Sequence, residues 1–410
     1  MSYHLVVIGY VWPEPNSSAA GENMMGLLTA FTQNGWRVTF LSAAAESAHM
    51  VDLPALGIQV KHINVNCSEF DSLIRVLAPN AVVFDRFMIE EQFSWRVRQQ
   101  CPEAVRIINT EDLHSLRHVR QQCTKETGKS EHGPVPFDNE MVQREVAAIL
   151  RSDLSLLISE PEIELLTTHF SVDAAQLWHQ PLMIAEDVTP QESDVTRAGF
   201  TFIGNYRHAP NWDALLHLKQ TLWPQIRAAI PQATLHVYGA YPGKKVTNLH
   251  NPRQGFLIEG WAPNARQALK KHKVMLAPLR FGAGVKGKLI TAMQCELPSI
   301  TTRIGAEGIA SAEDWPGAVA TTDEDFVQHS VRIYRNTESQ AEAIEKGHRV
   351  LSAKYDTRTH QDALAEKVLT LVNNTEQHRA PLFYQHLLWH QSLRATQYMS
   401  QWIEAKQNRN

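Results

Sequence analysis

The stretch VMLAPLRFGAGVKGKLITAM, residues 274–293, joins an apolar strand pattern to a helical pattern through a glycine-rich turn. VMLAPL is the continuous apolar run typical of a strand buried on both faces, and KLITAM begins a helical apolar period. Gly282, Gly284 and Gly287 let successive backbone N–H groups point into one concavity. A strand, an anion-binding turn and a helix in this order indicate a parallel α/β sheet with a ligand beside the helix N-terminus.

The same alternation of short apolar strands and helical segments continues over most of the 410 residues. In the first half the strand patterns lie at residues 5–10, 37–42, 58–65, 81–85, 105–110 and 154–159. In the second half they lie at residues 200–205, 234–240, 255–260, 273–279, 298–302 and 318–322. Continuous apolar strands separated by helices are typical of a parallel sheet covered on both faces. We therefore predict an α/β protein with two doubly wound, Rossmann-like parallel-sheet domains that face a cleft.

A polar stretch, MIAEDVTPQESDVTRAG at residues 183–199, separates the two sets of strands. It is rich in Pro, Asp, Glu, Ser and Thr and has no apolar period, which indicates a connection between domains. We predict a first domain at 1–182, a connection at 183–198, a second domain at 199–375 and a C-terminal helix at 376–410. This last helix is expected to cross back to the first domain, with its aromatic side chains packed against the body of the protein.

The composition is that of a globular protein: 43% of the residues are hydrophobic, 20% are charged, and the formal net charge is −4. No whole-chain field therefore favours nucleic acid as a partner. The four cysteines form no CxxC pair, and no histidine near them has zinc-site spacing, so we expect no metal and a reduced compartment. No apolar run approaches about 18 residues and the start has no basic segment, so we predict a cytoplasmic protein.

Basic residues gather around the glycine-rich turn. Between residues 244 and 303 there are eleven lysines and arginines against two acids, so this segment carries a charge of +9 and the rest of the chain −13. A local excess of this size around a glycine-rich loop favours a phosphorylated small molecule as the ligand. A solvated basic face is the alternative.

The turn itself matches two phosphate-binding patterns only in part. Residues 282–288 satisfy the first seven positions of a P-loop, but Leu289 stands where that loop carries Ser or Thr for magnesium. The three glycines satisfy the dinucleotide pattern GxGxxG, which normally follows the first strand of its domain and not a late one. We predict instead that backbone N–H groups, the helix N-terminus and the cations of Lys286 and Lys288 hold a diphosphate. A glycine-rich surface turn is the alternative.

Longer stretches support this prediction. Five of them follow one another along the chain: the segment at 13–42, INTEDLHSLRHVR at 108–120, REVAAILRSDLSLLISEPEIELL at 144–166, FIGNYRHAPNWDAL at 202–215 and APLRFGAGVKGKLITAMQCELPSITTRIGAEGI at 277–309. Together they resemble retaining glycosyltransferases of the GT-B fold, especially bacterial family-four (group 1) enzymes. The resemblance implies two domains, with the donor in the second, the acceptor in the first, and retention of configuration at the transferred sugar.

The chain departs from this family at one position beside the turn. The family commonly carries two glutamates in an E-x7-E pattern, and the second contacts the nucleotide ribose. Here the two positions hold Ala283 and Thr291. A carboxylate that would bridge ribose hydroxyls is therefore missing, and the identity of the nucleotide stays open. Glu307, in GAEGI, is expected to supply a nearby carboxylate, with a solvated turn residue as the alternative.

The candidate site residues come from both predicted domains. We expect the donor to be bound by Gly21, Gly204, Asn205, Arg207, Arg280, Gly282, Gly284, Val285, Lys286, Lys288 and Glu307. Lys286 is also expected to stabilise the charge of the departing diphosphate without a metal ion. The resemblance implies that His114 faces the transferred sugar and that Asp112 orients it or meets the acceptor. Plain turns, a surface arginine and a structural histidine are the alternatives.

These observations predict a hexosyltransferase-like enzyme of polysaccharide biosynthesis. It would move a sugar from a nucleotide-diphospho-sugar to a glycan or lipid-linked acceptor, and it could contact the inner face of the membrane peripherally through a basic or aromatic face. Two other functions stay open. Thr291 favours a non-catalytic relative kept as a binding or scaffold subunit. A sugar-nucleotide epimerase would need acid/base carboxylates around the sugar, and the sequence shows no such cluster.

Overall fold

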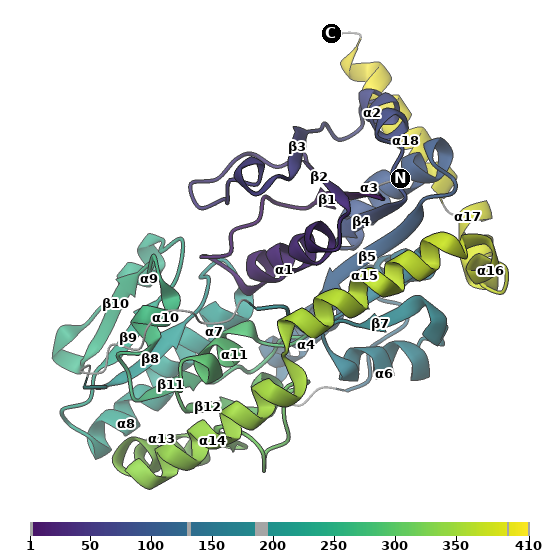
Figure 1. Cartoon of the computed structure of the whole chain (residues 1–410). Helices are drawn as coiled ribbons and strands as arrows, with labels where there is room; N and C mark the ends of the chain where they lie inside the picture. Colours follow the sequence, from purple (N-terminus) through teal and green to yellow (C-terminus); the bar gives the residue numbers. More distant parts are fainter. Residues whose placement is uncertain (1–2, 129–132, 185–195, 392, 409–410) are drawn as a thin grey trace.

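Two parallel sheets, each covered by helices on both faces, make up the protein (Figure 1). The computed structural model describes residues 3–128, 133–184, 196–391 and 393–408. Most of the predicted connection at 183–198 lies outside these residues. The prediction of two doubly wound α/β domains is confirmed, because neighbouring strands in both sheets are parallel and their order reverses inside each sheet.

The first sheet has seven strands in the order β3-β2-β1-β4-β5-β6-β7. Their bounds are β1 His4–Gly9, β2 Arg37–Ser42, β3 Gln59–His62, β4 Ala81–Asp85, β5 Val105–Glu111, β6 Leu154–Leu157 and β7 Leu177–His179. Six of them lie at the strand patterns of the sequence, whereas the three-residue β7 is too short to give a pattern. The central strands β1 and β4 are buried along their whole length, as expected for strands between two helical layers.

Helices cover both faces of this first sheet. They are α1 Ala19–Gln33, α2 Glu69–Leu77, α3 Phe87–Gln100, α4 His114–Thr127, α5 Glu140–Arg151 and α6 Glu160–Thr168. Side chains alternate across a strand, so Leu5 and Val7 of β1 pack with α1 on one face, and Val6 and Ile8 pack with α2 and α3 on the other.

The second sheet has six strands in the order β10-β9-β8-β11-β12-β13. Their bounds are β8 Phe200–Ile203, β9 Leu235–Tyr238, β10 Phe256–Gly260, β11 Val274–Ala277, β12 Ser299–Thr302 and β13 Gly317–Ala320. Its helices are α7 Ala209–His217, α8 Trp223–Ala229, α9 Lys244–Thr247, α10 Ala265–Leu269, α11 Gly287–Gln294, α12 Arg303–Ala306, α13 Asp323–Arg335 and α14 Thr337–Lys354. Helices α7, α8 and α13 pack on one face, and α11 and α14 pack on the other.

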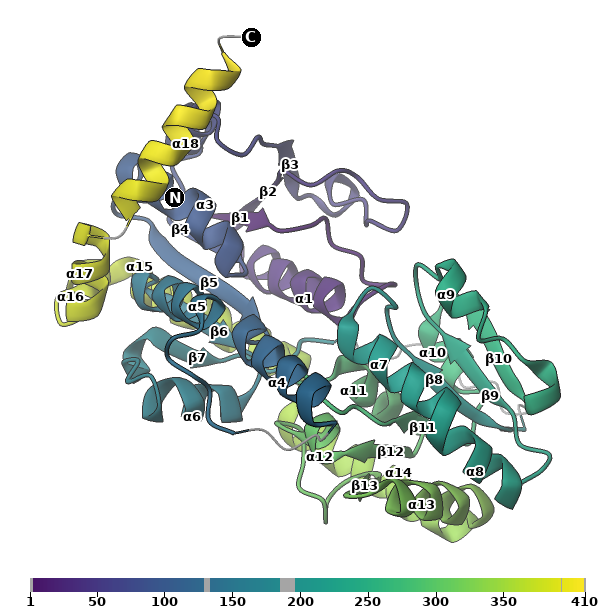
Figure 2. The ribbon, with the colours of Figure 1, turned by 180° about the vertical axis from the view of Figure 1, so that it is seen from behind.

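The chain returns to the first domain before the predicted boundary at residue 375. Helix α15, Thr357–Asn373, runs back along the first domain (Figure 1), and its Leu364, Val368 and Leu371 are buried in the same core cluster as Leu5. In place of one C-terminal helix there are three: α16 Thr375–Arg379, α17 Phe383–Gln391 and α18 Leu393–Gln407. Figure 2 shows α17 and α18 at the end of the first domain that lies away from the second.

Candidate active site

One hollow of about 1110 Å³ lies between the two domains, and we call it the cleft. Its first-domain wall is built by residues that follow β1, β4 and β5, and its second-domain wall by residues that follow β8 and β11. The strand order reverses between β1 and β4 in one sheet and between β8 and β11 in the other. Open α/β sheets bind ligands at this point of reversal, outside the carboxyl ends of the strands.

The two predicted lysines, Lys286 and Lys288, both line the cleft. Lys286 is buried, and its Nζ donates to the carbonyl oxygen of Gly284 at 2.6 Å and lies 4.0 Å from the carboxylate of Glu307. The Nζ of Lys288 donates to Oδ1 of Asn211 at 2.5 Å. Because this amide oxygen carries no full charge, it positions the Lys288 ammonium without neutralising it.

The surroundings of both lysines disfavour their positive charge. Burial, together with the neighbouring Lys286, lowers the pKa of Lys288 to about 7. Burial also lowers the pKa of Lys286 to about 8, against the attraction of Glu307. An anion placed beside the two ammonium groups would relieve their repulsion, so this part of the cleft is arranged to accept negative charge.

Two helices begin at the cleft with their N-termini uncapped. Helix α11 follows Lys286 and α7 follows His208, and in both cases no side-chain hydrogen bond caps the described helix start. The free N–H groups of a helix start carry partial positive charge and attract anions. Glycine is required beside one of these starts, because a Cβ on Gly204 would meet the side chain of Asn211 at 2.7 Å.

The opposite wall presents a charged carboxylate beside a neutral imidazole. The carboxylate of Asp112 pairs with Arg117 and lies 3.5 Å from Nε2 of His114. Burial raises the pKa of Asp112, but Arg117, His114 and His208 together outweigh burial, and the pKa falls to about 2. Burial lowers the pKa of His114 to about 3, against the attraction of Asp112. Glu145 caps α4 by accepting the N–H groups of His114 and Ser115 at 2.9 and 2.8 Å, which fixes the position of the imidazole.

A buried carboxyl group joins the glycine-rich turn to the first domain. Oε1 of Glu162 accepts the N–H of Leu113 at 3.2 Å and the N–H of Gly284, in the other domain, at 2.7 Å. Burial raises the pKa of Glu162 to about 8, and the charge of Asp112 acts in the same direction. Glu162 is therefore mostly protonated at neutral pH and bridges the domains as an uncharged acceptor.

Ion pairs close the cleft at its sides. The guanidinium of Arg120 donates to both carboxylate oxygens of Glu307 at 2.6 and 2.8 Å and to the carbonyl oxygen of Gly282 at 2.8 Å. On the other side, Arg266 of the second domain contacts Glu22 of the first at 2.6 Å. The bidentate pair of Arg120 with Glu307 is directional, so it holds the turn against the first domain in one orientation.

Nine of the predicted site residues lie together on the cleft: Asp112, His114, Gly204, Asn205, Arg207, Gly282, Val285, Lys286 and Lys288. Their roles stay predictions. The basic segment at 244–303 contributes less than its charge indicates, because only Arg266, Lys286 and Lys288 of its eleven cations line the cleft. For the other eight cations, the alternative of a solvated basic face is favoured.

Two charged residues that we expected on the donor do not line the cleft. The guanidinium of Arg280 is held by both oxygens of Asp213 at 2.5 and 2.9 Å. The carboxylate of Glu307 is held by Arg120. Each group already has a partner in the protein that satisfies its charge, so this arrangement does not favour a role on the donor, and both roles stay predictions.

Two predicted glycines also serve the fold and not the cleft wall. A Cβ on Gly21 would meet the carbonyl oxygen of Glu14 at 2.4 Å, so this glycine makes room for the loop before α1. The N–H of Gly284 is taken by Glu162, and a Cβ there would meet that of Asp112 at 2.7 Å. Gly284 therefore allows the two domains to approach each other, and neither glycine offers its backbone to a ligand in this arrangement.

Five charged residues of the cleft lining were not among the predicted site residues: Glu22, Arg86, Glu111, Arg117 and Arg266. Arg86 and Glu111 stand out for their backbone. They follow or end the neighbouring strands β4 and β5, and both have left-handed backbone angles, with φ of 74° and 59°. Side-chain amides of Asn23 and Asn109 donate to Oε1 of Glu111 at 3.2 and 2.9 Å, and burial raises its pKa to about 7. Strained backbone at non-glycine residues is common at functional sites, and charged residues directly after buried strands were the available signal.

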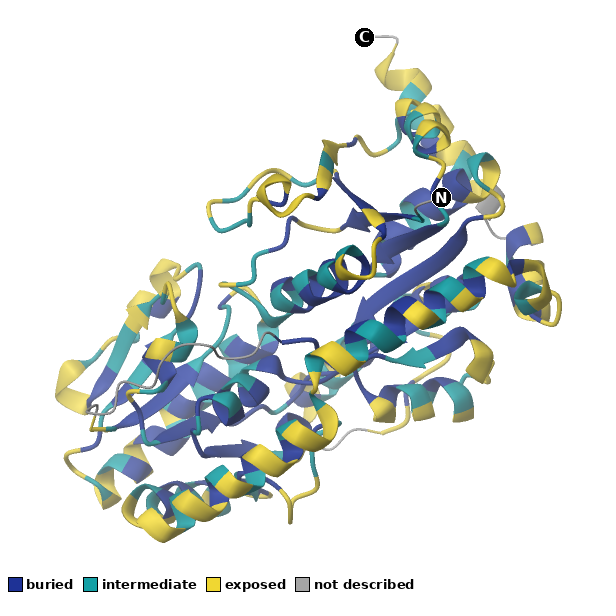
Figure 3. Cartoon of the chain, viewed as in Figure 1, coloured by how far each residue is buried: buried dark blue, intermediate teal, exposed yellow. Residues whose placement is uncertain are grey.

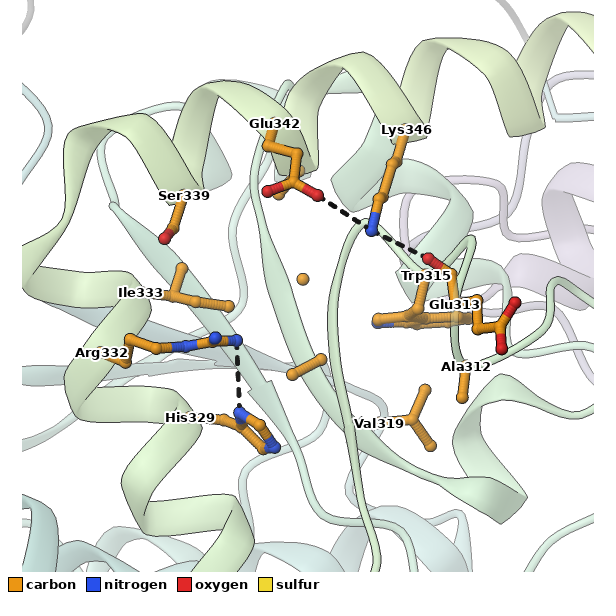
Figure 4. A pocket seen from close by; sticks show the side chains of 13 residues that line it. Ala312, Glu313, Trp315, Val319, His329, Arg332, Ile333, Ser339, Glu342 and Lys346 are labelled. Carbon is orange, nitrogen blue, oxygen red and sulfur yellow. Dashed lines mark hydrogen bonds and ion pairs between the residues drawn. The ribbon is translucent and has the colours of Figure 1, made fainter.

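A second hollow, of about 390 Å³, lies between β13, α13 and α14 (Figure 4). Arg332 and His329 reach into it from α13, with 3.4 Å between Nη2 and Nδ1, and Lys346 pairs with Glu342 on α14 at 3.2 Å. Its lining shares no residue with the cleft. The cleft, and not this hollow, collects the predicted site residues.

The described residues contain neither a metal-ligand cluster nor a membrane-spanning helix. Within the described ranges, no group of three or more His, Cys, Asp or Glu side chains is arranged to hold a metal ion. In that part of the chain, every helix is too short or too polar to cross a bilayer. The expectation of metal-independent binding stays a prediction.

Comparison with known proteins points to one family. Residues 197–336 match the family described as "Glycosyl transferases group 1". The match includes the strands β8 and β11, the glycine-rich turn and both lysines of the cleft. No curated protein matches the chain.

Solved structures share the two-domain architecture. HepE from Anabaena, solved with UDP-glucose, has a TM-score of 0.69 at 12% identity over 90% of this chain and 99% of that one. Sucrose-phosphate synthase from Thermosynechococcus elongatus has a TM-score of 0.66 at 13% identity, over 90% and 99%. A TarM variant from S. aureus, solved with UDP, has a TM-score of 0.57 at 13% identity. The matched part covers 74% of this chain and 58% of the TarM chain. The predicted GT-B fold is confirmed.

Proposed function

We propose, from the premise that residues 197–336 belong to the glycosyl transferases group 1 family, that this chain is a glycosyltransferase. It moves a sugar from a nucleotide-diphospho-sugar, bound mainly by the second domain, to an acceptor on the first. The GT-B fold supports this assignment, because its two domains enclose a cleft large enough for a donor and an acceptor.

One observation carries the proposal: Lys286 and Lys288 line the cleft beside the uncapped N-terminus of α11. Glycosyl transfer places negative charge on the departing diphosphate, and groups that are already oriented toward that charge lower the barrier most. The two ammonium groups and the free N–H groups of α11 take this role without a metal ion. The start of α7 and the guanidinium of Arg207 add positive charge on the other side.

The first domain holds the reacting sugar and the acceptor. His114 is neutral at physiological pH, so it donates or accepts a hydrogen bond with the sugar without adding charge. Asp112 orients the imidazole through their 3.5 Å contact. We propose a glycan or lipid-linked acceptor, retention of configuration, and work at the cytoplasmic side of the membrane with peripheral contact.

Thr291, on α11, lines the cleft where the family carries a glutamate. Its hydroxyl donates to the carbonyl oxygen of Gly287 at 3.0 Å and offers no carboxylate to a ribose. HepE was solved with UDP and with UDP-glucose. Uridine nucleotides are therefore the first donors to test on this chain.

Calorimetric titration with UDP tests the proposal. The wild-type chain should bind UDP, and Lys288→Gln should weaken binding at least about tenfold, because a hydrogen bond to a charged group contributes about 1.5–3 kcal/mol. Lys245→Gln removes an exposed lysine outside the cleft and should leave binding unchanged. No binding of UDP or another nucleoside diphosphate by the wild type, or equal binding by Lys288→Gln, would remove the proposal.

Turnover separates the enzyme from its two alternatives. A glycosyltransferase releases nucleoside diphosphate and joins the sugar to an acceptor, whereas an epimerase returns an isomeric sugar nucleotide. A scaffold subunit binds the nucleotide and does neither. Analysis of products from a panel of sugar nucleotides and saccharide acceptors distinguishes the three.

A further inference from the structure

The last two helices present their apolar side to solvent. Of the large hydrophobic side chains that are exposed in the described structure, six lie on α17 and α18: Phe383, Tyr384, Leu387, Tyr398, Met399 and Trp402. Between 43% and 68% of each side chain is exposed. We expected the apolar side chains of this part of the chain to pack against the body. That expectation is wrong for Phe383, Leu387, Tyr398 and Trp402, whereas Trp389 is buried as expected. Figure 3 shows the outward side of α18 as exposed.

The orientation of α18 is the reverse of that of an ordinary surface helix. Tyr398, Met399 and Trp402 follow a helical spacing on the exposed side, whereas the buried residue of this turn is Ser400. A helix at the surface of a globular protein normally turns its apolar stripe to the core. The side of α18 that carries Glu404 faces the body instead, and Oε1 of Glu404 accepts the N–H of Ser68 at 2.9 Å.

Helix α17 also faces the first domain with a side that carries polar anchors. Gln385 is buried and donates to Oδ1 of Asp153 at 2.8 Å and to the carbonyl oxygen of Arg151 at 3.2 Å. Trp389 is the aromatic residue of this helix that is buried, and its Nε1 also donates to Arg151 at 3.0 Å. Polar bonds therefore fix which side of α17 faces the first domain, and Phe383 stays outside.

The chemistry of the exposed side matches an anionic bilayer. Phe, Tyr and Trp side chains prefer the boundary between lipid headgroups and acyl chains, where a ring is buried and a polar edge stays wet. Lys406 lies 5.2 Å from the Trp402 ring, and His386 and His390 are exposed on α17. The acid of the two helices, Glu404, is engaged with the body, so among the described side chains the exposed side carries the ammonium of Lys406 and no carboxylate.

Charge argues against a second copy of the chain as the occupant. Two copies that met through this side would bring the Lys406 ammonium of each copy into one apolar interface, without a described carboxylate of the same side to pair with it. Phosphate groups of anionic lipids supply the missing negative charge at the depth that aromatic rings prefer.

We propose that the exposed side of α17 and α18 docks on the surface of an anionic lipid bilayer. The helices lie in the interface plane and do not cross it, which fits their lengths of 9 and 15 residues. The inference deepens the peripheral membrane contact proposed above by naming its surface, and it rests on the proposed function only for the location of the acceptor.

Flotation with vesicles tests the proposal on the full chain without any sugar nucleotide. The wild type should float with vesicles of phosphatidylcholine and phosphatidylglycerol and bind less to phosphatidylcholine alone. The double variant Tyr398→Ser, Trp402→Ser should lower the partition coefficient at least about tenfold, because two interfacial rings are lost. Leu56→Ser, which removes an apolar side chain of 53% exposure elsewhere in the first domain, is the matched control.

Several results would overturn the proposal. One is a wild type that binds neither vesicle, and another is a double variant that binds as well as the wild type. Light scattering supplies the third: a wild-type dimer that the double variant dissociates would make this side an interface between copies. Calorimetry with UDP on the double variant keeps the two proposals apart, because its nucleotide binding should equal that of the wild type.

Discussion

Lys286 and Lys288 are two residues apart, and each depends on a neutral oxygen that keeps its ammonium group in place. Lys286 donates to a backbone carbonyl of its own turn and Lys288 donates to Asn211. With pKa values lowered to about 8 and about 7, both groups titrate close to physiological pH. Their charge is therefore conditional, and a bound anion would raise both pKa values again.

Nucleotide affinity should consequently depend on pH. The protonated lysines bind the diphosphate, so raising the pH through about 7 and then about 8 should weaken UDP binding, by at most about tenfold per pH unit for each proton lost. Lys288→Arg stays protonated and should reduce this loss. Calorimetry over this range checks the prediction, and an affinity that does not change with pH would contradict it.

The pKa of Glu162 predicts a pH dependence of stability with a defined sign. Its pKa rises from 4.5 to about 8 on folding, so between these values the folded chain holds a proton that the unfolded chain lacks. The stability that Glu162 contributes through its raised pKa is fully present below about pH 4.5 and is lost as the pH rises toward about 8. Glu162→Gln keeps an oxygen acceptor for Gly284 and should flatten the fall of Tm over this window.

The exposed residue Glu164, on the same helix, supplies the control for this experiment. Glu164→Gln should leave the slope of Tm against pH as in the wild type. An identical slope in the wild type and Glu162→Gln would show that the carboxyl group of Glu162 is not held protonated by the interface.

At the scale of single residues, the sequence predicted which side chains carry charge near the turn but not which of them are already paired. Arg280 and Asp213 are 67 positions apart, and the pairing of Glu307 with Arg120 spans 187. Such partners follow from the packing of two sheets and leave no periodic signal. Arg86 and Glu111 stand at the ends of buried strands, which was a usable signal, whereas their left-handed backbone angles appear only in the folded chain.

Among the elements, the glycine-rich turn before α11 connects the cleft to the first domain. Gly284 has φ of 60°, and its N–H reaches Glu162 across the interface. The strands and helices around the turn were predictable, because buried parallel strands read as continuous apolar runs. The contact of the turn with the first domain was not predictable, because no local pattern encodes how closely two domains approach each other.

Substitution of Gly284 should therefore disturb the interface as well as the turn. Gly284→Ala introduces a Cβ 2.7 Å from that of Asp112 at a left-handed φ, so we expect a loss of at least about 1 kcal/mol of stability and weaker UDP binding. Gly243→Ala, where a Cβ meets no atom within 4 Å and φ is −73°, is the control. Thermal unfolding and calorimetry measure both effects, and equal behaviour of the two variants would contradict the expected clash.

Across the whole molecule, the C-terminal helices join the second domain back to the first. The position of α15 in the core of the first domain could not be predicted from the sequence, because the apolar period of this helix fits either domain. The same limit explains the wrong expectation for α17 and α18. Their aromatic content indicated a packed helix, while buried polar anchors such as Gln385 determined the opposite orientation.

Truncation of an α15 side chain should destabilise the first domain. Leu364 is fully buried in that core, so Leu364→Ala should lower its free energy of unfolding by about 2–5 kcal/mol. Leu387→Ala, on the exposed side of α17, should change it by less than about 0.5 kcal/mol. Denaturant unfolding measures both, and a small effect of Leu364→Ala would mean that α15 is not part of the first-domain core.

The account rests on a nucleoside diphosphate bound in the cleft against α11. A crystal structure of the chain with UDP tests this most directly. We predict density for the two phosphates between the starts of α7 and α11, with the Nζ of Lys288 at about 3 Å from a phosphate oxygen. UDP bound outside the cleft, or in the cleft with both lysines turned away from its phosphates, would contradict the account.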